Sequence, residues 1–153
     1  MNAAAFAPLT ETSLHTAVTE LARRDADLAR IVDRIGPPPL WAREPGFPTL
    51  VLLILEQQVS LASARAAFNR LEAAIGAVTP AGVLSLSDDE LRGVGFSRQK
   101  SGYARDLATA IQSGAFDPDH LADLDDDGVR RALTARKGIG PWTAEIYLLM
   151  VLR

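Results

Sequence analysis

The stretch that decides the fold is ALTARKGIGPWTAEI, residues 132–146. A helical segment leads into a glycine–isoleucine–glycine turn, and Pro141 directly after the turn suits the first position of a second helix. We expect Gly138 and Gly140 to adopt backbone angles that are closed to other residues, and to leave no side chain in front of an approaching group. Ile139 between them is expected to enter the core. The stretch therefore predicts two helices joined by a tight turn.

The start of the second helix is a predicted anion site. The backbone amides of Gly140, Trp142 and Thr143 lie where the first N–H groups of a helix have no partner within it and the helix dipole favours negative charge. Arg136 and Lys137 come directly before the turn, so the anion that we expect is a backbone phosphate of a nucleic acid. Such contacts position nucleic acid without reading its sequence. The alternative is an ordinary corner between two helices with a glycine cap.

The net charge of −3 hides a local pattern. Residues 92–105 carry four basic side chains and no acidic one, and so do residues 130–137. The acids gather elsewhere, with six aspartates within residues 117–127. Phosphate binding depends on the local field and not on the total charge. Either basic segment alone is typical of a solvated helix face, but two of them beside glycine turns favour a polyanionic partner.

The rest of the chain is predicted to be helical, because apolar residues recur at spacings of three and four and no window alternates with period two. Ser13 is the expected cap of an N-terminal helix or helix pair, and the proline-rich residues 36–48 form a connector that no helix crosses. The expected starts and ends of the other helices are Pro48, Leu61, Gly76, Thr79-Pro80, the capping box Ser87–Glu90, Ser97, Gly114, and Asp125 or Asp126. The sequence predicts an all-α bundle of about eight to ten short helices.

The composition is that of an ordinary globular domain and excludes several classes of protein. The chain has 153 residues, of which 48% are hydrophobic and 23% charged, and it contains no cysteine. Without cysteine it forms no disulfide, no thiolate zinc site and no cysteine-bound iron–sulfur cluster. No apolar run reaches the length of about 18 residues that a membrane span needs, and the N-terminus lacks the pattern of a secretory signal. We expect one cytoplasmic, nucleoid-associated domain without membrane contact.

Three motifs, placed at family spacing, resemble the HhH-GPD superfamily of DNA glycosylases, and within it the 3-methyladenine DNA glycosylase II type. They are KGIGPWTA (137–144), LILEQQVSLASARAAFNRL (53–71) and LSLSDDELRGVGFSRQKSGYARDLATAI (84–111). The resemblance is strongest over residues 48–153, and before residue 40 it extends only to helical character. It implies a helix-hairpin-helix motif at the turn, within a single HhH-GPD-like helical domain over residues 1–153 that is incomplete at its C-terminus.

The resemblance implies a monofunctional glycosylase of base excision repair, which flips alkylated purines out of double-stranded DNA and hydrolyses their glycosidic bond. Members that also cut the DNA backbone carry a lysine nucleophile after the hairpin, where this sequence has Trp142. An indole cannot attack the sugar. Trp142 is therefore expected to form part of the base pocket and to stack on the extruded base, whose positive charge an aromatic face attracts. The alternative is that Trp142 is a core residue at a helix start.

The DNA contacts of the family carry over position by position. Gln58 corresponds to the side chain that wedges into the duplex and fills the gap left by the flipped base. Gln57 and Ser60 beside it are expected to stabilise their tight turn. The other positions that match DNA contacts are Lys137, Gly138, Gly140 and Thr143. The backbone carbonyls that match those holding a monovalent cation, Na⁺ or K⁺, belong to Thr134, Arg136 and Gly138.

The resemblance places the catalytic aspartate about twenty residues after Trp142, which is beyond Arg153. Glu145 lies too close to Trp142 to replace it. Residues 146–152 form an apolar run without a polar face, and such a helix needs cover on every side. We therefore expect a chain that lacks its catalytic end and self-associates through residues 146–152. The alternatives are a non-catalytic DNA-binding module and a protein-interaction module on the same scaffold, and an aspartate in the sequence after Arg153 would favour the enzyme.

Overall fold

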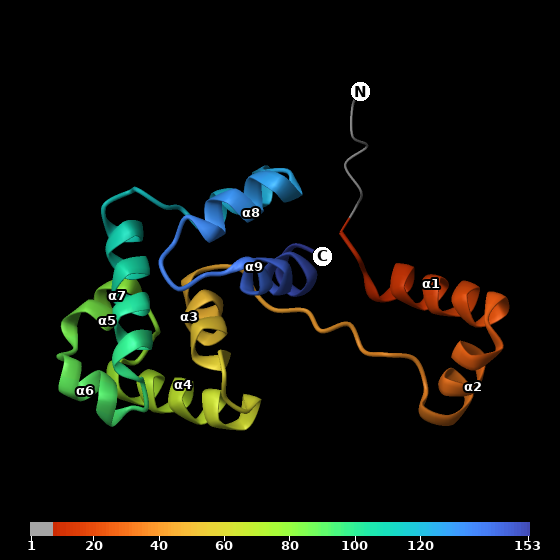
Figure 1. Cartoon of the computed structure of the whole chain (residues 1–153), viewed down its shortest axis with the longest axis horizontal. Coiled ribbons are helices and arrows are strands. Elements are labelled where there is room, and N and C mark those ends of the chain that lie inside the picture. Colours follow the sequence, from red (N-terminus) through yellow and green to blue (C-terminus); the bar gives the residue numbers. More distant parts are fainter. Residues whose placement is uncertain (1–7) are drawn as a thin grey trace. The chain divides into compact units, whose positions relative to one another are not determined.

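The computed structural model describes residues 8–153, and all of their regular secondary structure is helical. Nine α-helices and no β-strand occur within these residues (Figure 1). In chain order they are α1 (Glu11–Arg24), α2 (Ala26–Ile35), α3 (Phe47–Glu56), α4 (Leu61–Ile75), α5 (Pro80–Ser85), α6 (Asp88–Gly93), α7 (Arg98–Gln112), α8 (Asp126–Thr134) and α9 (Pro141–Tyr147). A 3-10 helix (Asp119–Asp123) precedes α8, and a π-helical segment (Leu148–Leu152) continues α9. The predicted all-α class is confirmed.

The chain divides into two compact units between Ala42 and Arg43. The first unit contains α1 and α2, neither of which has a buried residue. Asp25 separates the two helices, because its carboxylate accepts hydrogen bonds from the first amides of α2. The prediction that Ser13 caps α1 is wrong. Thr10 is the N-cap, and Ser13 lies at the third helical position, where its hydroxyl returns a bond to the Thr10 backbone in a capping box.

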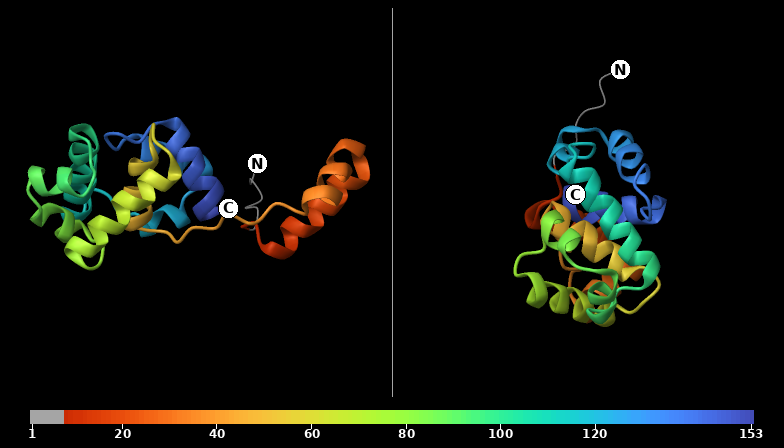
Figure 2. Two further views of the ribbon diagram at one scale, coloured as in Figure 1. Left: turned by 90° about the horizontal axis from the view of Figure 1, so that it is seen from below. Right: turned by 90° about the vertical axis from the view of Figure 1, so that its left-hand side faces the viewer.

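The second unit is built around α3. The proline-rich connector ends without helix before Gly46, the N-cap of α3, and Pro48 lies in the first turn as predicted. Seven of the ten residues of α3 are buried, so the helix is apolar on nearly every face. It contacts α4, α7 and α9, which Figures 1 and 2 show gathered around it. Of these neighbours, α9 belongs to the hairpin, so α3 packs directly against one of the two hairpin helices.

Local caps fix the starts of the helices that follow. Ser60 caps α4, Thr79 caps α5 and Ser97 caps α7, each through a hydroxyl that accepts a backbone N–H. The predicted capping box of α6 is present: the Ser87 hydroxyl accepts the Glu90 amide, and the Glu90 carboxylate accepts the Ser87 amide at 2.7 Å. The helix α7 packs on both α3 and α5, which fixes its position within this unit.

The last helical segment is covered on one side. Tyr147 and Val151 are buried, whereas Leu149 is 60% exposed. The backbone amide of Arg43 donates to the Met150 carbonyl at 2.8 Å, which ties the end of the segment to the start of the second unit. Self-association through residues 146–152 remains a prediction. The exposed apolar side chain that this segment offers for it is Leu149. None of the helices in residues 8–153 has the length and apolar character to cross a membrane.

Candidate nucleic-acid interface

The loop between α8 and α9 forms the predicted hairpin. Thr134 ends α8, and Gly140 is the N-cap of α9, with Pro141 as the first helical residue. The Ile139 amide donates to the Arg136 carbonyl at 3.1 Å, which closes the turn. Ile139 is buried, as its position between two glycines predicted. The turn is thus fixed to the core from inside.

The two glycines of the hairpin have different roles. Gly138 has a φ of +82°, and a Cβ at this residue would come within 2.2 Å of the Tyr103 ring. Gly140 has a φ of −90° and a ψ of 176°, which is ordinary extended backbone, and nothing lies within 4 Å of where its Cβ would be. The prediction of a special backbone angle is correct for Gly138 and wrong for Gly140, because an N-cap residue needs only an extended conformation. Of the two glycines, only Gly140 has open space in front of its backbone.

The start of α9 offers backbone amides without partners in the helix. No side chain caps this helix, and the first N–H groups of a helix have no partner within it. Their charge and the helix dipole favour an anion. The Thr143 side chain is not available to such an anion, because the residue is 7% exposed and its hydroxyl accepts a hydrogen bond from Gln57 at 3.4 Å. A phosphate contact from Thr143 would therefore use its amide, and it remains a prediction.

The two basic residues of the hairpin differ in the freedom of their side chains. The guanidinium of Arg136 lies over the Phe116 ring, 5.7 Å from the ring centroid, and its buried Nε has no hydrogen-bond partner. Lys137 is exposed. Their adjacency suggested two cations for a phosphate, but the packing of Arg136 on Phe116 holds that side chain against the protein. Lys137 is the residue of this pair that can meet an incoming anion.

Thr134, Arg136 and Gly138, whose carbonyls are predicted to hold a monovalent cation, line one hollow of about 430 Å³. The Arg136 carbonyl accepts a bond from Ile139, and the Gly138 carbonyl accepts one from Gln57. Because a carbonyl has two lone pairs, each keeps one for an ion. These residues therefore fit Na⁺ or K⁺, which remains a prediction. Within residues 8–153, no group of three or more His, Cys, Asp or Glu side chains could hold a metal ion.

The turn between α3 and α4 presents Gln58. Its φ of 57° is positive, which is uncommon for a residue with a side chain, and Gln58 is exposed. Ser60, which caps α4, ends the turn, as its predicted stabilising role implies. The role of Gln58 as a wedge remains a prediction. Nothing in the sequence indicated the positive φ, since glutamine does not favour that conformation.

Gln57 reaches out of its own turn to the hairpin. Its Nε2 donates to the Gly138 carbonyl at 2.8 Å, across a sequence separation of 81 residues, and also lies 3.4 Å from the Thr143 hydroxyl. This contact extends the predicted role of Gln57, which was limited to its own turn. A polar side chain that bonds a distant backbone carbonyl leaves no periodic or spacing signal in the sequence.

Two further side chains hold the end of α3, and neither was predicted to do so. Lys100 Nζ donates to the Leu55 carbonyl at 2.7 Å, and burial lowers the pKa of this ammonium group. Arg43 forms a bidentate pair with Glu56, at 2.9 and 3.0 Å, and both side chains are largely buried. Lys100 therefore binds protein backbone, although it belongs to the basic segment 92–105 that suggested phosphate binding.

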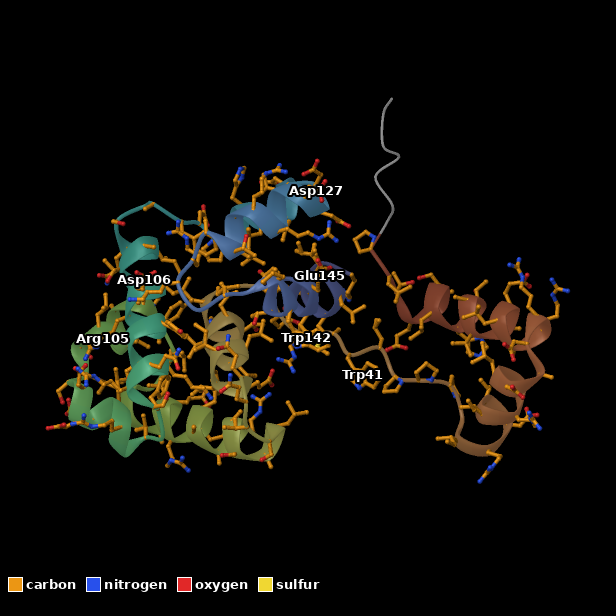
Figure 3. The ribbon with its side chains drawn as sticks, in the orientation of Figure 1. Trp41, Arg105, Asp106, Asp127, Trp142 and Glu145 are labelled. Carbon is orange, nitrogen blue, oxygen red and sulfur yellow. The ribbon has the colours of Figure 1, made fainter. Side chains whose placement is uncertain are left out.

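Trp142 is 77% exposed on α9, where Figure 3 labels it. The exposure excludes the alternative that this residue belongs to the core. Trp142 lines a second hollow, of about 380 Å³, together with Leu53 and Ile146 and with residues of the Gln58 turn and the hairpin. An exposed indole beside apolar side chains can stack on a planar group. Stacking on an extruded base remains a prediction.

The acidic side chains beside the hairpin are engaged in ion pairs. Arg130 on α8 donates to both carboxylate oxygens of Glu145 on α9, at 2.6 and 3.2 Å, and to Asp127 at 2.9 Å. The hydrogen bonds from Arg130 lower the pKa of the Glu145 carboxyl. These bonds join the two helices of the hairpin, which gives Glu145 a structural role.

The hairpin, the Gln58 turn and the intervening helices fall within one recognised domain. The family model described as the HhH-GPD superfamily of base excision DNA repair proteins matches residues 51–147, more than half of the chain. The chain belongs to this superfamily. The matched part of the HhH-GPD domain runs from α3 to the last residue of α9.

Curated HhH-GPD relatives are longer than this chain. Endonuclease III of Sulfolobus acidocaldarius is 32% identical over 111 residues, which cover 70% of this chain and 48% of that protein. DNA-3-methyladenine glycosylase 1 of Schizosaccharomyces pombe is 28% identical over 148 residues, which cover 92% of this chain and 65% of that protein. The chain thus spans between about half and two thirds of the length of these two relatives.

Solved structures show the same arrangement of helices. The structure of a DNA-3-methyladenine glycosidase from Bacillus halodurans is 33% identical, with a TM-score of 0.72 over 88% of this chain and 63% of that chain. A 3-methyladenine DNA glycosylase of Schizosaccharomyces pombe in complex with abasic DNA is 27% identical, with a TM-score of 0.80 over 90% of this chain and 70% of that chain. The likeness therefore extends well beyond the hairpin of the HhH-GPD domain.

Proposed function

We propose that this HhH-GPD domain belongs to a monofunctional DNA glycosylase that removes alkylated purines of the 3-methyladenine type from duplex DNA. The observation that carries the proposal is the exposed Trp142 directly after the hairpin, where members that also cut the backbone are expected to have a lysine. An indole forms no Schiff base with the sugar. It can stack on an extruded base and attract the positive charge of an alkylated purine. The relatives named as 3-methyladenine glycosylases support this choice of substrate.

In this proposal residues 1–153 act as one domain that binds the duplex and opens it locally. The amides at Gly138 and Gly140 and the exposed Lys137 bind phosphates, so the binding is independent of DNA sequence. Gln58 fills the gap left by the flipped base. The carbonyls along the first hollow would hold Na⁺ or K⁺, whose charge would offset that of the backbone oxygens beside the phosphate. A protein that acts on genomic DNA in this way would work in the nucleoid.

The proposed reaction is hydrolysis, in which water replaces the base on the sugar. The carboxylate that the resemblance implies lies about twenty residues after Trp142, beyond Arg153. Glu145 does not take that role in the proposal, because Arg130 occupies both of its oxygens. The reaction requires no redox chemistry, and the chain has no cysteine for an iron–sulfur cluster.

Release of 3-methyladenine from alkylated duplex DNA tests this proposal. The full-length polypeptide used in this assay is one that extends to the implied aspartate. Wild-type protein is expected to release the base and to leave the DNA backbone uncut. Trp142→Ala is expected to reduce release by about tenfold or more, since stacking of a base on an aromatic side chain contributes about 1–3 kcal/mol. Trp142→Phe should keep part of the activity. Trp41→Ala is the matched control, because Trp41 is also exposed, at 62%.

Two results would contradict the proposal. Strand cleavage that accompanies base release by the wild-type protein would show a lyase and remove the argument from Trp142. Full activity of Trp142→Ala would show that the indole does not hold the base.

A further inference from the structure

The end of α3 is held at three successive residues, each by a different part of the chain. Lys100 on α7 donates a hydrogen bond to the Leu55 carbonyl. Arg43, which precedes α3, donates to the Glu56 carboxylate. The side-chain amide of Gln57 donates to the Gly138 carbonyl in the hairpin. The next residue along the chain is Gln58, which is exposed at a positive φ. The side chain proposed to enter the duplex thus follows directly on a firmly held helix end.

Gln57 is the tie that reaches the proposed phosphate site. Its Nε2 donates to the carbonyl of Gly138, and the hydroxyl that it also approaches belongs to Thr143, a buried residue in the first turn of α9. The Tyr103 ring also packs against Gly138, where a Cβ would come within 2.2 Å of it. A shift of the Gln58 turn relative to the hairpin would break these hydrogen bonds, and the close contact with Tyr103 limits the movement of Gly138.

We propose that Gln57 is a positioning residue that couples the phosphate-binding hairpin to the gap-filling side chain of Gln58. The inference rests on the proposed function, since it presumes that both elements meet DNA. The hairpin holds the phosphate backbone, and the Gln57 amide sets where Gln58 stands relative to those phosphates. Gln58 therefore enters the duplex in register with the bound backbone. Loss of the Gln57 donor leaves the hairpin able to bind phosphates but releases the turn from it.

Binding to two duplexes of identical sequence tests the coupling. One duplex is intact, and the other contains a tetrahydrofuran abasic analogue, which offers a gap for Gln58. Fluorescence anisotropy of the wild-type chain is expected to show preference for the abasic duplex. Gln57→Met keeps the length of the side chain and removes the donor. We expect it to bind the intact duplex within about twofold of wild type and to lose about tenfold of the preference for the gap, as expected for one lost hydrogen bond.

The double variant of Gln57→Met and Gln58→Ala distinguishes a positioning role of Gln57 from a merely structural one. In the wild-type background Gln58→Ala should reduce the preference for the abasic duplex, whereas in the Gln57→Met background it should change little, because the wedge is already out of register. Gln112→Met is the matched control: Gln112 is an exposed glutamine at the end of α7. Gln57→Glu is the second variant, since it keeps the size of the side chain while its carboxylate cannot donate. Its negative charge weakens binding to both duplexes, so the ratio of the two affinities is compared, and this ratio should show the same loss of preference.

The outcomes separate the inference from the proposed function. Preference retained in both Gln57 variants, while Gln58→Ala loses it, would overturn the coupling and leave the proposed function intact. Equal losses on both duplexes would also overturn it, because that result means that the whole interface is disturbed. A wild-type chain that binds neither duplex would overturn the proposed function and the inference together.

Discussion

The Tyr103 ring lies so close to the backbone of Gly138 that a Cβ on residue 138 would come within 2.2 Å of it. Gly140, in the same turn, has open space at the corresponding point. The first glycine is therefore required by the packing of α7 against the hairpin, whereas no contact within residues 8–153 requires the second. A motif that looks symmetrical in the sequence thus contains two glycines in different environments.

This difference predicts opposite results for two alanine substitutions. Gly138→Ala is expected to lower the free energy of unfolding by about 2 kcal/mol or more, from the positive φ and the clash with Tyr103. Gly140→Ala should leave stability unchanged within about 0.5 kcal/mol and weaken DNA binding by blocking the approach to the backbone. Urea unfolding and anisotropy titrations on both variants measure the two effects. Unchanged DNA affinity of Gly140→Ala would remove the start of α9 from the interface.

The binding of duplex DNA is expected to be independent of sequence and to weaken steeply with salt, because the contacts are chiefly to phosphates. Lys137→Ala should lower the slope of log affinity against log salt by about one. Arg23→Ala is the matched control, since it removes one positive charge from α1, where that side chain pairs with Glu20. Titrations at several salt concentrations decide the matter, and an equal change of slope in both variants would contradict a specific role of Lys137.

Tyr147→Phe is expected to raise the free energy of unfolding by about 1 kcal/mol at neutral pH. Tyr147 is fully buried, and its hydroxyl has no hydrogen-bond partner within residues 8–153. Burial raises the pKa of the Tyr147 phenol above its ordinary value of 10.0; the nearby Gly46 backbone favours ionisation but does not reach hydrogen-bonding geometry. A destabilised variant would show that the hydroxyl does have a partner.

The same phenol is expected to lower the stability of the wild-type chain at alkaline pH. Because its pKa is raised in the folded state, the folded chain keeps a proton that the unfolded chain releases above about pH 10. Stability therefore falls as the pH rises through that range, and Tyr147→Phe should reduce the fall. Urea unfolding at neutral and at alkaline pH compares the two chains.

Glu145→Gln is expected to leave base release by the full-length polypeptide unchanged, since Glu145 serves as a partner of Arg130. Arg130 lowers the pKa of the Glu145 carboxyl from its ordinary 4.5. The pair therefore contributes stability that is fully present above that value and is lost as the pH falls through the lowered pKa. Glu145→Gln should be less sensitive to acid in that range. A large loss of base release would instead identify Glu145 as catalytic.

Leu149→Gln is expected to reduce self-association without loss of stability, because Leu149 is exposed in the last helical segment. Contiguous apolar patches usually mark association surfaces, and we expect Leu149 to contribute to one. Leu61→Gln is the matched control, since Leu61 is 66% exposed at the start of α4. Sedimentation over a wide concentration range measures the effect. A wild-type chain that stays monomeric throughout would contradict the prediction.

The starts of the helices could be predicted from the sequence because their causes are local. The hydroxyls of Ser60, Ser87 and Ser97 each accept an amide three residues later, so a few neighbouring residues contain the whole interaction. The error at α1 has the same origin. Thr10 and Ser13 form a reciprocal pair of bonds, and either residue alone resembles a cap.

The hairpin was predictable as a motif, but the contacts that hold it were not. Gln57 and Gly138 lie far apart in the chain, and an amide that donates to a backbone carbonyl selects no particular residue type there. Arg136 and Lys137 are adjacent in the sequence, yet only the fold brings the Phe116 ring beneath one of them. Tertiary packing decides which of two neighbouring cations remains available to a ligand.

The hydrogen bonds and the ion pair at three successive residues fix the end of α3, and they therefore constrain the length of that helix. Each added residue would advance the helix end by about 1.5 Å and turn it by about 100°. An insertion or deletion between Pro48 and Gln58 would withdraw the partners of Leu55, Glu56 and Gln57 together, whereas one substitution there removes at most one of them. The length of α3 is therefore constrained by three partners at once, in addition to the packing of its buried side chains, and this length sets the distance from the start of the helix to the interface.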